Sequence, residues 1–278
     1  MSPRSGVIAA LTCVVLSLAL ASCRSAPASH TTPVPPSSPP TSSASTKASD
    51  RCGAGATTGT VITFQAADGT TLDGVLVGHA STGVVLVHEY PADLCGFLPY
   101  AEYLGAHGVE AVALDLRCFG NATCPASAAA RARIPQDVAA GAAELRRRGV
   151  SQVALLGASL GCTIALIAAP TVHPAPASVV CLSGHARYTA TVGTTAVPLD
   201  AAAAVRHTTS PALFVVAVDD PRVGAGEVRA LYTGYAGRTK RLDVLSGAYT
   251  GGHGWDLLSR SSTWTPLAAQ LAAYLGRF

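Results

Sequence analysis

The sequence feature that most constrains the fold is a serine flanked by glycines between two apolar segments. Residues 153–156 read VALL, residues 157–161 read GASLG, and residues 163–169 read TIALIAA. This order predicts a buried strand, a sharp turn and a helix, with the serine side chain standing clear of the sheet at the positive end of the helix. A chain with 27 Gly can produce such a turn by chance, but the strand-turn-helix setting favours Ser159 as a nucleophile.

The N-terminal residues 1–22 have the proportions of a signal peptide. An uncharged apolar run, residues 7–20, follows Arg4 and is too short to span a bilayer as a stable anchor. Its end, Leu-Ala-Ser followed by Cys23, resembles the bacterial lipoprotein signal. The resemblance implies that Cys23 is lipidated and holds an extracytoplasmic protein on the cell membrane. Ordinary secretory cleavage beside a cysteine is the alternative.

Residues 23–51 are expected to form a disordered tether. They are rich in Ser, Thr, Pro and Ala and contain too little apolar surface to repay the cost of ordering. The prolines should keep the tether partly extended. The remaining residues, 52–278, have the length of one α/β domain.

Charge and cysteine content restrict the expected partners. A net charge of +3 without a basic run argues against nucleic acid. No histidine or cysteine spacing is typical of zinc, and we expect neither metal nor cofactor. In an exported domain the remaining cysteines suggest disulfides; these are Cys52, Cys95, Cys118, Cys124, Cys162 and Cys181. We favour the pairs Cys118 with Cys124 and Cys162 with Cys181. In the alternative interpretation, Cys162 and Cys181 are unpaired thiols buried as small hydrophobic residues.

Apolar strands alternate with helical segments through the domain. Asp68-Gly69 predicts a hairpin between 60–64 and 72–77. Further strands are expected at 83–88, 111–116, 152–157, 178–182, 212–218 and 240–245, and helices at 98–107, 134–147, 160–169, 199–205, 224–235 and 264–276. This alternation predicts a mostly parallel sheet of about eight strands with helices on both faces. Ligands bind at the carboxyl ends of the strands in such sheets.

Three residue types used in nucleophilic catalysis follow these strands, in the order serine, aspartate, histidine. Ser159 follows one strand, Asp219-Asp220 another, and His253 lies in a later loop. With this order, the chain resembles the alpha/beta-hydrolase superfamily from about Asp68 onward, most of all its small capless dienelactone-hydrolase-like and acyl-esterase-like members. The matching stretches read GVVLVHEYPADLCGFLPYAEYLGAHGVEAVALDLRCFG, VALLGASLG, PALFVVAVDDPRV and GGHGW.

The resemblance implies a catalytic triad. A serine hydroxyl needs a base to accept its proton, and the histidine needs a carboxylate, so Ser159, His253 and Asp220 are the expected members. Asp220 takes the family's acid position before a proline, and Asp219 is the alternative. The backbone N–H groups of Leu160 and of Tyr90 or its neighbour are the expected oxyanion donors.

One residue departs from the family pattern. Many members have His-Gly where this chain has His88-Glu89. A carboxylate facing a developing oxyanion would be unfavourable, so we expect Glu89 to point away, toward Arg117. His88 is expected to be structural.

Only residues 183–211 lie where this fold commonly inserts a lid, so a large lid does not fit and the pocket should be open and shallow. We expect a hydrolase of small or short-acyl carboxylic esters. A non-catalytic envelope protein that reuses the fold for binding, or an acyltransferase with the same triad, are the alternatives. Oligomeric state and substrate identity are not indicated.

Overall fold

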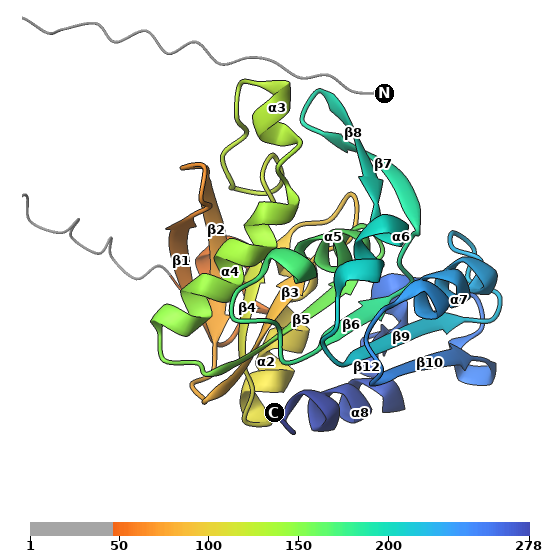
Figure 1. The fold of residues 1–278 in the computed structure, drawn as a ribbon. Coiled ribbons are helices and arrows are strands. Elements are labelled where there is room, and N and C mark those ends of the chain that lie inside the picture. Colours follow the sequence, from red (N-terminus) through yellow and green to blue (C-terminus); the bar gives the residue numbers. More distant parts are fainter. Residues whose placement is uncertain (1–46) are drawn as a thin grey trace, which may run out of the picture. The chain divides into compact units, whose positions relative to one another are not determined.

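The computed structural model describes residues 47–278 (Figure 1). The signal segment, Cys23 and the tether up to residue 46 lie outside the described residues. Helix α1 (Ala48–Cys52) begins before the expected domain start at residue 52 and packs on the domain. Lys47 forms a β-bridge with Thr60, and Ala48 is 1% exposed. The last residues of the expected tether are therefore part of the fold.

The centre of the domain is an eight-stranded sheet with the order β1-β2-β4-β3-β5-β6-β9-β10. The strands are β1 (Thr60–Gln65), β2 (Thr71–Val77), β3 (Thr82–Val87), β4 (Glu110–Leu114), β5 (Gln152–Ala158), β6 (Val179–Leu182), β9 (Ala212–Ala217) and β10 (Lys240–Leu245). Strand β2 runs antiparallel to both β1 and β4, and the other neighbours are parallel. The mostly parallel sheet predicted from the sequence is confirmed.

Helices cover both faces of this sheet (Figure 1). One face carries α2 (Leu98–Ala106) and α8 (Pro266–Leu275), and the other carries α4 (Pro135–Arg147), α5 (Leu160–Ala168) and α7 (Ala225–Gly234). In β3, Val84 and Leu86 join the first core, whereas Val85 and Val87 join the second. A strand buried on both sides must be apolar throughout, which explains its continuous apolar run. Within residues 47–278 no helix is long and apolar enough to cross a bilayer.

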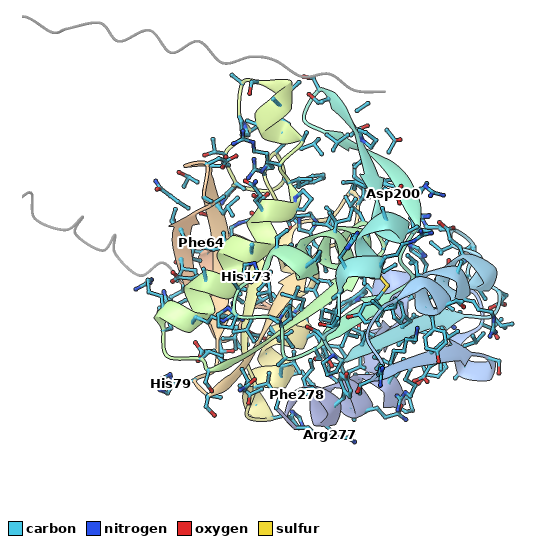
Figure 2. All side chains as sticks on the ribbon, viewed as in Figure 1. Phe64, His79, His173, Asp200, Arg277 and Phe278 are labelled. Carbon is cyan, nitrogen blue, oxygen red and sulfur yellow. A yellow bond between two sulfur atoms is a disulfide. The ribbon has the colours of Figure 1, made fainter. Side chains whose placement is uncertain are left out.

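The segment where a lid would be inserted forms a small hairpin that the sequence did not predict. Strands β7 (Arg187–Val192) and β8 (Thr195–Asp200) pair antiparallel, and the short helix α6 (Ala201–Ala204) begins only after Asp200, whose carboxylate accepts a hydrogen bond from the Ala203 N–H at 2.9 Å. Figure 2 labels Asp200 at this junction. Alternate hairpin residues face the core beside α5 and are buried: Ala190, Val192, Val197 and Leu199. The expected helix at 199–205 is thus two residues too early, and a large lid is absent.

The other short elements lie in the connections. They are η1 (Leu94–Gly96), α3 (Ala128–Arg131), η2 (Ala169–Thr171), η3 (Val205–His207), η4 (Gly247–Tyr249), η5 (Gly254–Leu257), β11 (Ser259–Arg260) and β12 (Thr263–Trp264). Elements η4 and η5 belong to the loop that carries His253 after β10. Both follow the carboxyl end of a sheet strand, where the site was expected.

Three disulfides connect the described cysteines. The two predicted pairs, Cys118–Cys124 and Cys162–Cys181, are confirmed. The third, Cys52–Cys95, joins α1 to η1 across 43 residues of sequence.

Candidate active site

The turn at Ser159 has the strained backbone geometry that its sequence predicts. Ser159 connects β5 to α5 with φ 50° and ψ −116°, a backbone conformation that residues other than glycine rarely adopt. A Cβ at Gly157 would overlap the backbone of Gly161, and a Cβ at Gly161 would overlap the carbonyl oxygens of Val87 and His88. The glycines are therefore required by the close approach of β3, β5 and α5.

His253 and Asp220 are hydrogen-bonded to each other at the same edge of the sheet. The Nδ1 of His253 lies 2.8 Å from Oδ1 of Asp220 and 3.1 Å from its Oδ2. The backbone N–H groups of Arg222 and Val223 also donate to this carboxylate, each at 2.9 Å. Burial raises the pKa of Asp220, but these hydrogen bonds outweigh the burial and hold its pKa below the usual value. The carboxylate is thus kept ionised and aimed at the imidazole.

Asp219 has a different contact. Its Oδ1 accepts a hydrogen bond from the Gly251 N–H at 2.9 Å, two residues before His253. The two aspartates lie in the turn after β9, where the Asp220 N–H donates to the carbonyl of Ala217 at 3.3 Å, and their carboxylates bond different groups. Asp220 contacts the imidazole, whereas Asp219 holds the loop that carries it.

His253 and Ser159 belong to loops that approach each other. A Cβ added to Gly254 would lie 3.4 Å from the Cβ of Ala158. The residue after His253 and the residue before Ser159 are therefore within contact distance. His253 is 7% exposed and Ser159 is 8% exposed. Among residues 47–278 the Nε2 of His253 has no hydrogen-bond partner although it is buried. No hydrogen bond joins it to Ser159 within this part of the chain, and such contacts often tighten only when substrate binds.

The two expected oxyanion donors are both free in the described part of the chain. The N–H of Leu160 is in the first turn of α5, where no carbonyl of the helix can accept it. The N–H of Tyr90 lies in the loop after β3 and likewise has no partner between residues 47 and 278. The Tyr90 side chain is 45% exposed and meets the ring of Phe119 edge-on at 6.1 Å.

Glu89 does not point toward Arg117, so that expectation was wrong. Its Oε2 accepts a hydrogen bond from the Trp255 N–H at 3.2 Å, and its carboxylate fills the space beside the Cα of Gly254. Burial raises the pKa of Glu89, although the Trp255 N–H and the charge of His253 act in the opposite direction. Glu89 thus connects the loop after β3 to the loop that carries His253.

Arg117 is instead buried between two other carboxylates. Its Nη2 lies 2.6 Å from Asp137 and its Nη1 lies 2.8 Å from Asp68. The Arg117 side chain is 0% exposed, and its ion pairs are with these two carboxylates and not with Glu89. The ion pairs fix the start of α4 and the hairpin turn between β1 and β2.

His88 is structural, as its position at a strand end suggested. Its Nδ1 donates to the carbonyl of Glu89 at 2.9 Å, and its Nε2 accepts the N–H of Leu116 at 3.3 Å. Burial lowers the pKa of His88, in agreement with a neutral ring that accepts one hydrogen bond and donates another.

Sequence reasoning missed the part played by Asp115. This residue is 0% exposed, and its carboxylate accepts hydrogen bonds from the N–H groups of Leu94 and Asn121 and from Arg51. It follows β4 directly, at the edge where the site lies. The expected strand ran two residues too far, and an aspartate inside an otherwise apolar run was the signal that could have revealed it.

A cavity of about 720 Å³ adjoins the histidine loop. Its lining includes Trp255 and Asp256, the second and third residues after His253, together with Tyr103 and Trp264. Ser159 is not among its lining residues, so this cavity is not the space above the nucleophile. In residues 47–278 no group of three or more histidine, cysteine or acidic side chains is placed to hold a metal ion.

Comparison with known proteins supports the fold. No family model matches the sequence, and no curated protein matches it either. Among solved structures, the chain is similar to an esterase of Pyrococcus furiosus, with a TM-score of 0.65 and 14% identity over 79% of this chain and 91% of that one. An esterase of Exiguobacterium antarcticum matches with a TM-score of 0.61 and 17% identity, covering 77% of this chain and 98% of the other.

A membrane phospholipase A described as a bacterial virulence factor is also similar, with a TM-score of 0.60 and 15% identity over 78% of this chain and 86% of that one. At these identities the likeness concerns the fold. The chain has the alpha/beta-hydrolase fold, with an eight-stranded, mostly parallel sheet, a serine at a strand-turn-helix elbow and a histidine–aspartate pair at the same edge.

Proposed function

We propose that the protein is a serine hydrolase that cleaves small carboxylic esters through an acyl-enzyme. The observation that carries this proposal is the pairing of His253 with Asp220 on a loop that adjoins the Ser159 turn. The esterases among the similar structures support the same class of reaction. Fold similarity alone does not fix chemistry, so the argument depends on these side chains.

In the first half-reaction, Ser159 Oγ attacks the ester carbonyl carbon and its proton passes to His253 Nε2. Asp220, hydrogen-bonded to Nδ1, holds the ring in the required tautomer and stabilises the imidazolium that forms. The carbonyl oxygen becomes an oxyanion, which the N–H groups of Leu160 and Tyr90 stabilise. Each such donor contributes about 3 kcal/mol in the transition state. Collapse breaks the bond to the alcohol oxygen, which takes the proton from His253 and leaves.

In the second half-reaction, water replaces the alcohol. His253 accepts a proton from water as its oxygen attacks the acyl carbon, and the same donors stabilise the second oxyanion. The bond to Ser159 Oγ then breaks, Oγ regains the proton, and the carboxylic acid is released. The full cycle consumes one ester and one water molecule and restores Ser159 and His253 to their starting protonation states.

The substrate surface favours short acyl groups. The segment between β6 and β9 forms only the β7–β8 hairpin and short helices, so within residues 47–278 this segment supplies no long apolar lid. Two large apolar side chains at the carboxyl ends of strands are exposed, namely Tyr90 after β3 and Val218 after β9. Both lie at the edge of the sheet that carries the site, and two such side chains offer little surface for burying a long acyl chain.

We further propose that the protein is held outside the cytoplasm by lipid on Cys23. The support is the apolar run ending in Leu-Ala-Ser-Cys and the Ser/Thr/Pro-rich segment behind it. The three disulfides of the described domain fit an oxidising compartment. Metabolic labelling with a radioactive fatty acid should label the native chain and not a Cys23→Ser variant; equal labelling of both would contradict the anchor.

A panel of p-nitrophenyl esters of graded acyl length tests the activity. We expect turnover that falls with chain length for the native chain, and a loss of about 10⁴-fold or more in kcat for Ser159→Ala. Equal rates for the two proteins would refute a serine mechanism. Activity that rises with acyl length would contradict the proposed short-acyl preference.

One observation favours a rival function. Glu89 places a carboxylate beside the histidine loop, and Ser159 is only 8% exposed. A non-catalytic protein that binds a small ligand at this edge would retain the fold without turning over esters. A native chain that binds but never hydrolyses any ester of the panel would favour this rival.

A further inference from the structure

The loop that carries the proposed oxyanion donor is anchored at both ends. We define the oxyanion loop as residues 88–97, between β3 and α2. At its start, His88 accepts the N–H of Leu116 and donates to the carbonyl of Glu89. At its end, the N–H of Leu94 donates to Oδ1 of Asp115 at 2.9 Å. Tyr90, the proposed donor, lies between these two anchors.

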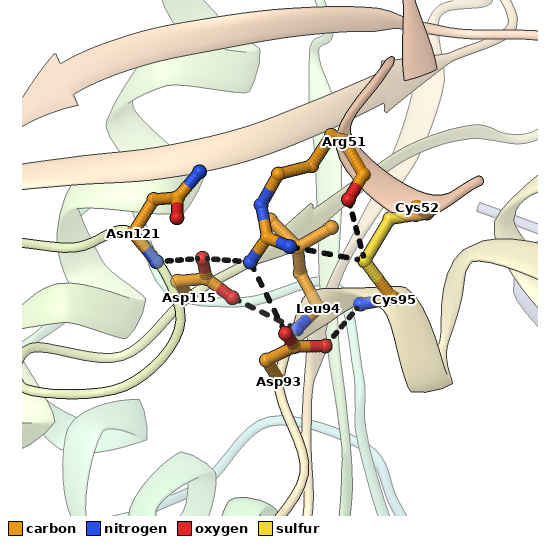
Figure 3. Close-up of a disulfide and its surroundings, with 7 residues drawn as sticks. All are labelled: Arg51, Cys52, Asp93, Leu94, Cys95, Asp115 and Asn121. Atoms are coloured by element: carbon orange, nitrogen blue, oxygen red, sulfur yellow. Dashed lines mark hydrogen bonds and ion pairs between the residues drawn. A yellow bond between two sulfur atoms is a disulfide. The ribbon is translucent and has the colours of Figure 1, made fainter. Parts of the chain in front are cut away.

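The second anchor is completed by the N-terminal helix α1 (Figure 3). Cys52 forms a disulfide with Cys95 of the oxyanion loop. The neighbouring Arg51 extends its Nη2 to Asp93 at 3.2 Å and to Asp115 at 2.8 Å. One guanidinium therefore bridges the oxyanion loop and the aspartate that follows β4.

The contact between Arg51 and Asp115 is buried, whereas Asp93 is 35% exposed, so the loss of Arg51 falls mainly on Asp115. The side chain of Arg51 is 12% exposed, and that of Asp115 is 0% exposed. Removal of the cation would leave the Asp115 carboxylate buried with only the backbone N–H groups of Leu94 and Asn121 as partners. Relief of that unpaired charge requires the carboxylate, or the loop bonded to it, to move toward water.

Helix α1 is itself fixed to the domain. Lys47 pairs with Thr60 at the edge of β1, the N–H of Ala48 donates to the carbonyl of Gly59 at 3.3 Å, and Ala48 is buried. The residues directly before α1 belong to the segment expected to lead to the membrane anchor. The element that continues this segment is thus bonded to the active-site loop.

We propose that α1 positions the oxyanion loop, through the Cys52–Cys95 disulfide and the bridge from Arg51 to Asp93 and Asp115, so that the Tyr90 N–H faces the reacting carbonyl. Arg51, Cys52 and Cys95 are positioning residues and do not touch substrate. This inference rests on the proposed ester hydrolysis for its effect on turnover, whereas the ordering of the loop by α1 does not depend on any activity.

The test uses the full chain, purified in detergent, with two test variants and one control. Arg51→Met keeps the apolar stem and the disulfide but removes the bridge, and Arg241→Met is its matched control, since within residues 47–278 Arg241 pairs with Asp243 alone, at the exposed edge strand β10. The double variant Cys52→Ser/Cys95→Ser removes the disulfide. Hydrogen exchange of residues 88–97 and turnover of p-nitrophenyl acetate are both measured.

We expect Arg51→Met and the Cys52/Cys95 variant to exchange the amides of residues 88–97 at least about 10-fold faster than the native chain, as local opening becomes easier. Turnover should fall by about 10- to 100-fold in kcat with KM within about twofold, because a misplaced donor affects the transition state more than substrate binding. The control Arg241→Met should match the native chain in the exchange of residues 88–97 and in kcat. If the Cys52/Cys95 variant does not fold, Arg51→Met decides the question.

Unchanged exchange of residues 88–97 in Arg51→Met would overturn the positioning role, whatever the activity. Faster exchange with unchanged kcat would overturn the link between the loop and catalysis. A native chain without esterase activity would refute the proposed function, and the exchange comparison would still decide whether α1 orders the loop.

Discussion

The Nδ1 atom of His253 lies 2.8 Å from Oδ1 of Asp220, while the adjacent Asp219 bonds the backbone of Gly251 instead. Two neighbouring carboxylates thus serve one loop in two ways, one contacting the imidazole and the other holding the backbone that carries it. The difference allows their contributions to be separated by mutation.

Asp220→Asn should lower kcat for p-nitrophenyl esters by about 10⁴-fold, because an amide at this position favours the wrong tautomer of the imidazole. Asp219→Asn should cost about 10-fold or less, since an amide oxygen can still accept the Gly251 N–H. Steady-state kinetics on the two variants checks this order. Equal losses of kcat in the two variants would contradict the assignment of Asp220 as the carboxylate that orients His253.

Gly254→Ala should impair catalysis through Glu89. Gly254 has φ 51°, and a Cβ there would collide with the Glu89 carboxylate. The clash should displace the histidine loop and lower kcat by about 100-fold, as expected for a misplacement near 1 Å. Glu89→Ala in the same chain should recover part of the loss, because it removes the colliding atoms. A double variant no better than Gly254→Ala would show that backbone strain, and not Glu89, causes the defect.

Arg117→Met should destabilise the fold without acting on the site. Arg117 is 0% exposed between Asp137 and Asp68, and its removal leaves buried carboxylates unpaired. The expected loss is about 3–5 kcal/mol in the free energy of unfolding, measured by urea denaturation. The control Arg187→Met removes an exposed ion pair with Asp200 and should cost about 1 kcal/mol or less. Similar losses for both variants would contradict this account.

The same ion pair predicts a pH dependence of stability. The hydrogen bond from Arg117 lowers the pKa of Asp68 from 3.8 to about 2. A group whose pKa is depressed in the folded state adds stability that is complete above its unfolded pKa and is lost as pH falls through the folded one. The stability difference between the native chain and Asp68→Asn should therefore be constant near neutral pH and shrink between about pH 4 and pH 2. A difference that stays constant down to pH 2 would contradict it.

The parts of the site that could be predicted from the sequence are those set by local backbone requirements. Ser159 stands between glycines that no other residue can replace, because Gly161 packs on the end of β3. Asp220 and His253 follow sheet strands, and the carboxyl ends of neighbouring parallel strands meet at one edge. These relations follow from sequence order once the strands are recognised.

The parts that could not be predicted depend on contacts between distant segments. The partner of Glu89 is the backbone of Trp255, 166 residues later in the chain, and nothing in the local sequence indicates that contact. The strands β7 and β8 are rich in Thr and Ala, so their alternation of buried and exposed side chains is weak as a sequence signal. Helix α1 has five residues and is held by the Cys52–Cys95 disulfide and Arg51, which only the folded chain brings to the oxyanion loop.

Covalent labelling of Ser159 tests the central claim most directly. The purified chain is treated with a fluorophosphonate probe, which reacts with serines activated by a neighbouring base, and the modified peptide is identified by mass spectrometry. We predict labelling at Ser159 in the native chain, none in Ser159→Ala, and strongly slowed labelling in His253→Ala. A native chain that stays unlabelled, or one labelled at another serine, would contradict the account.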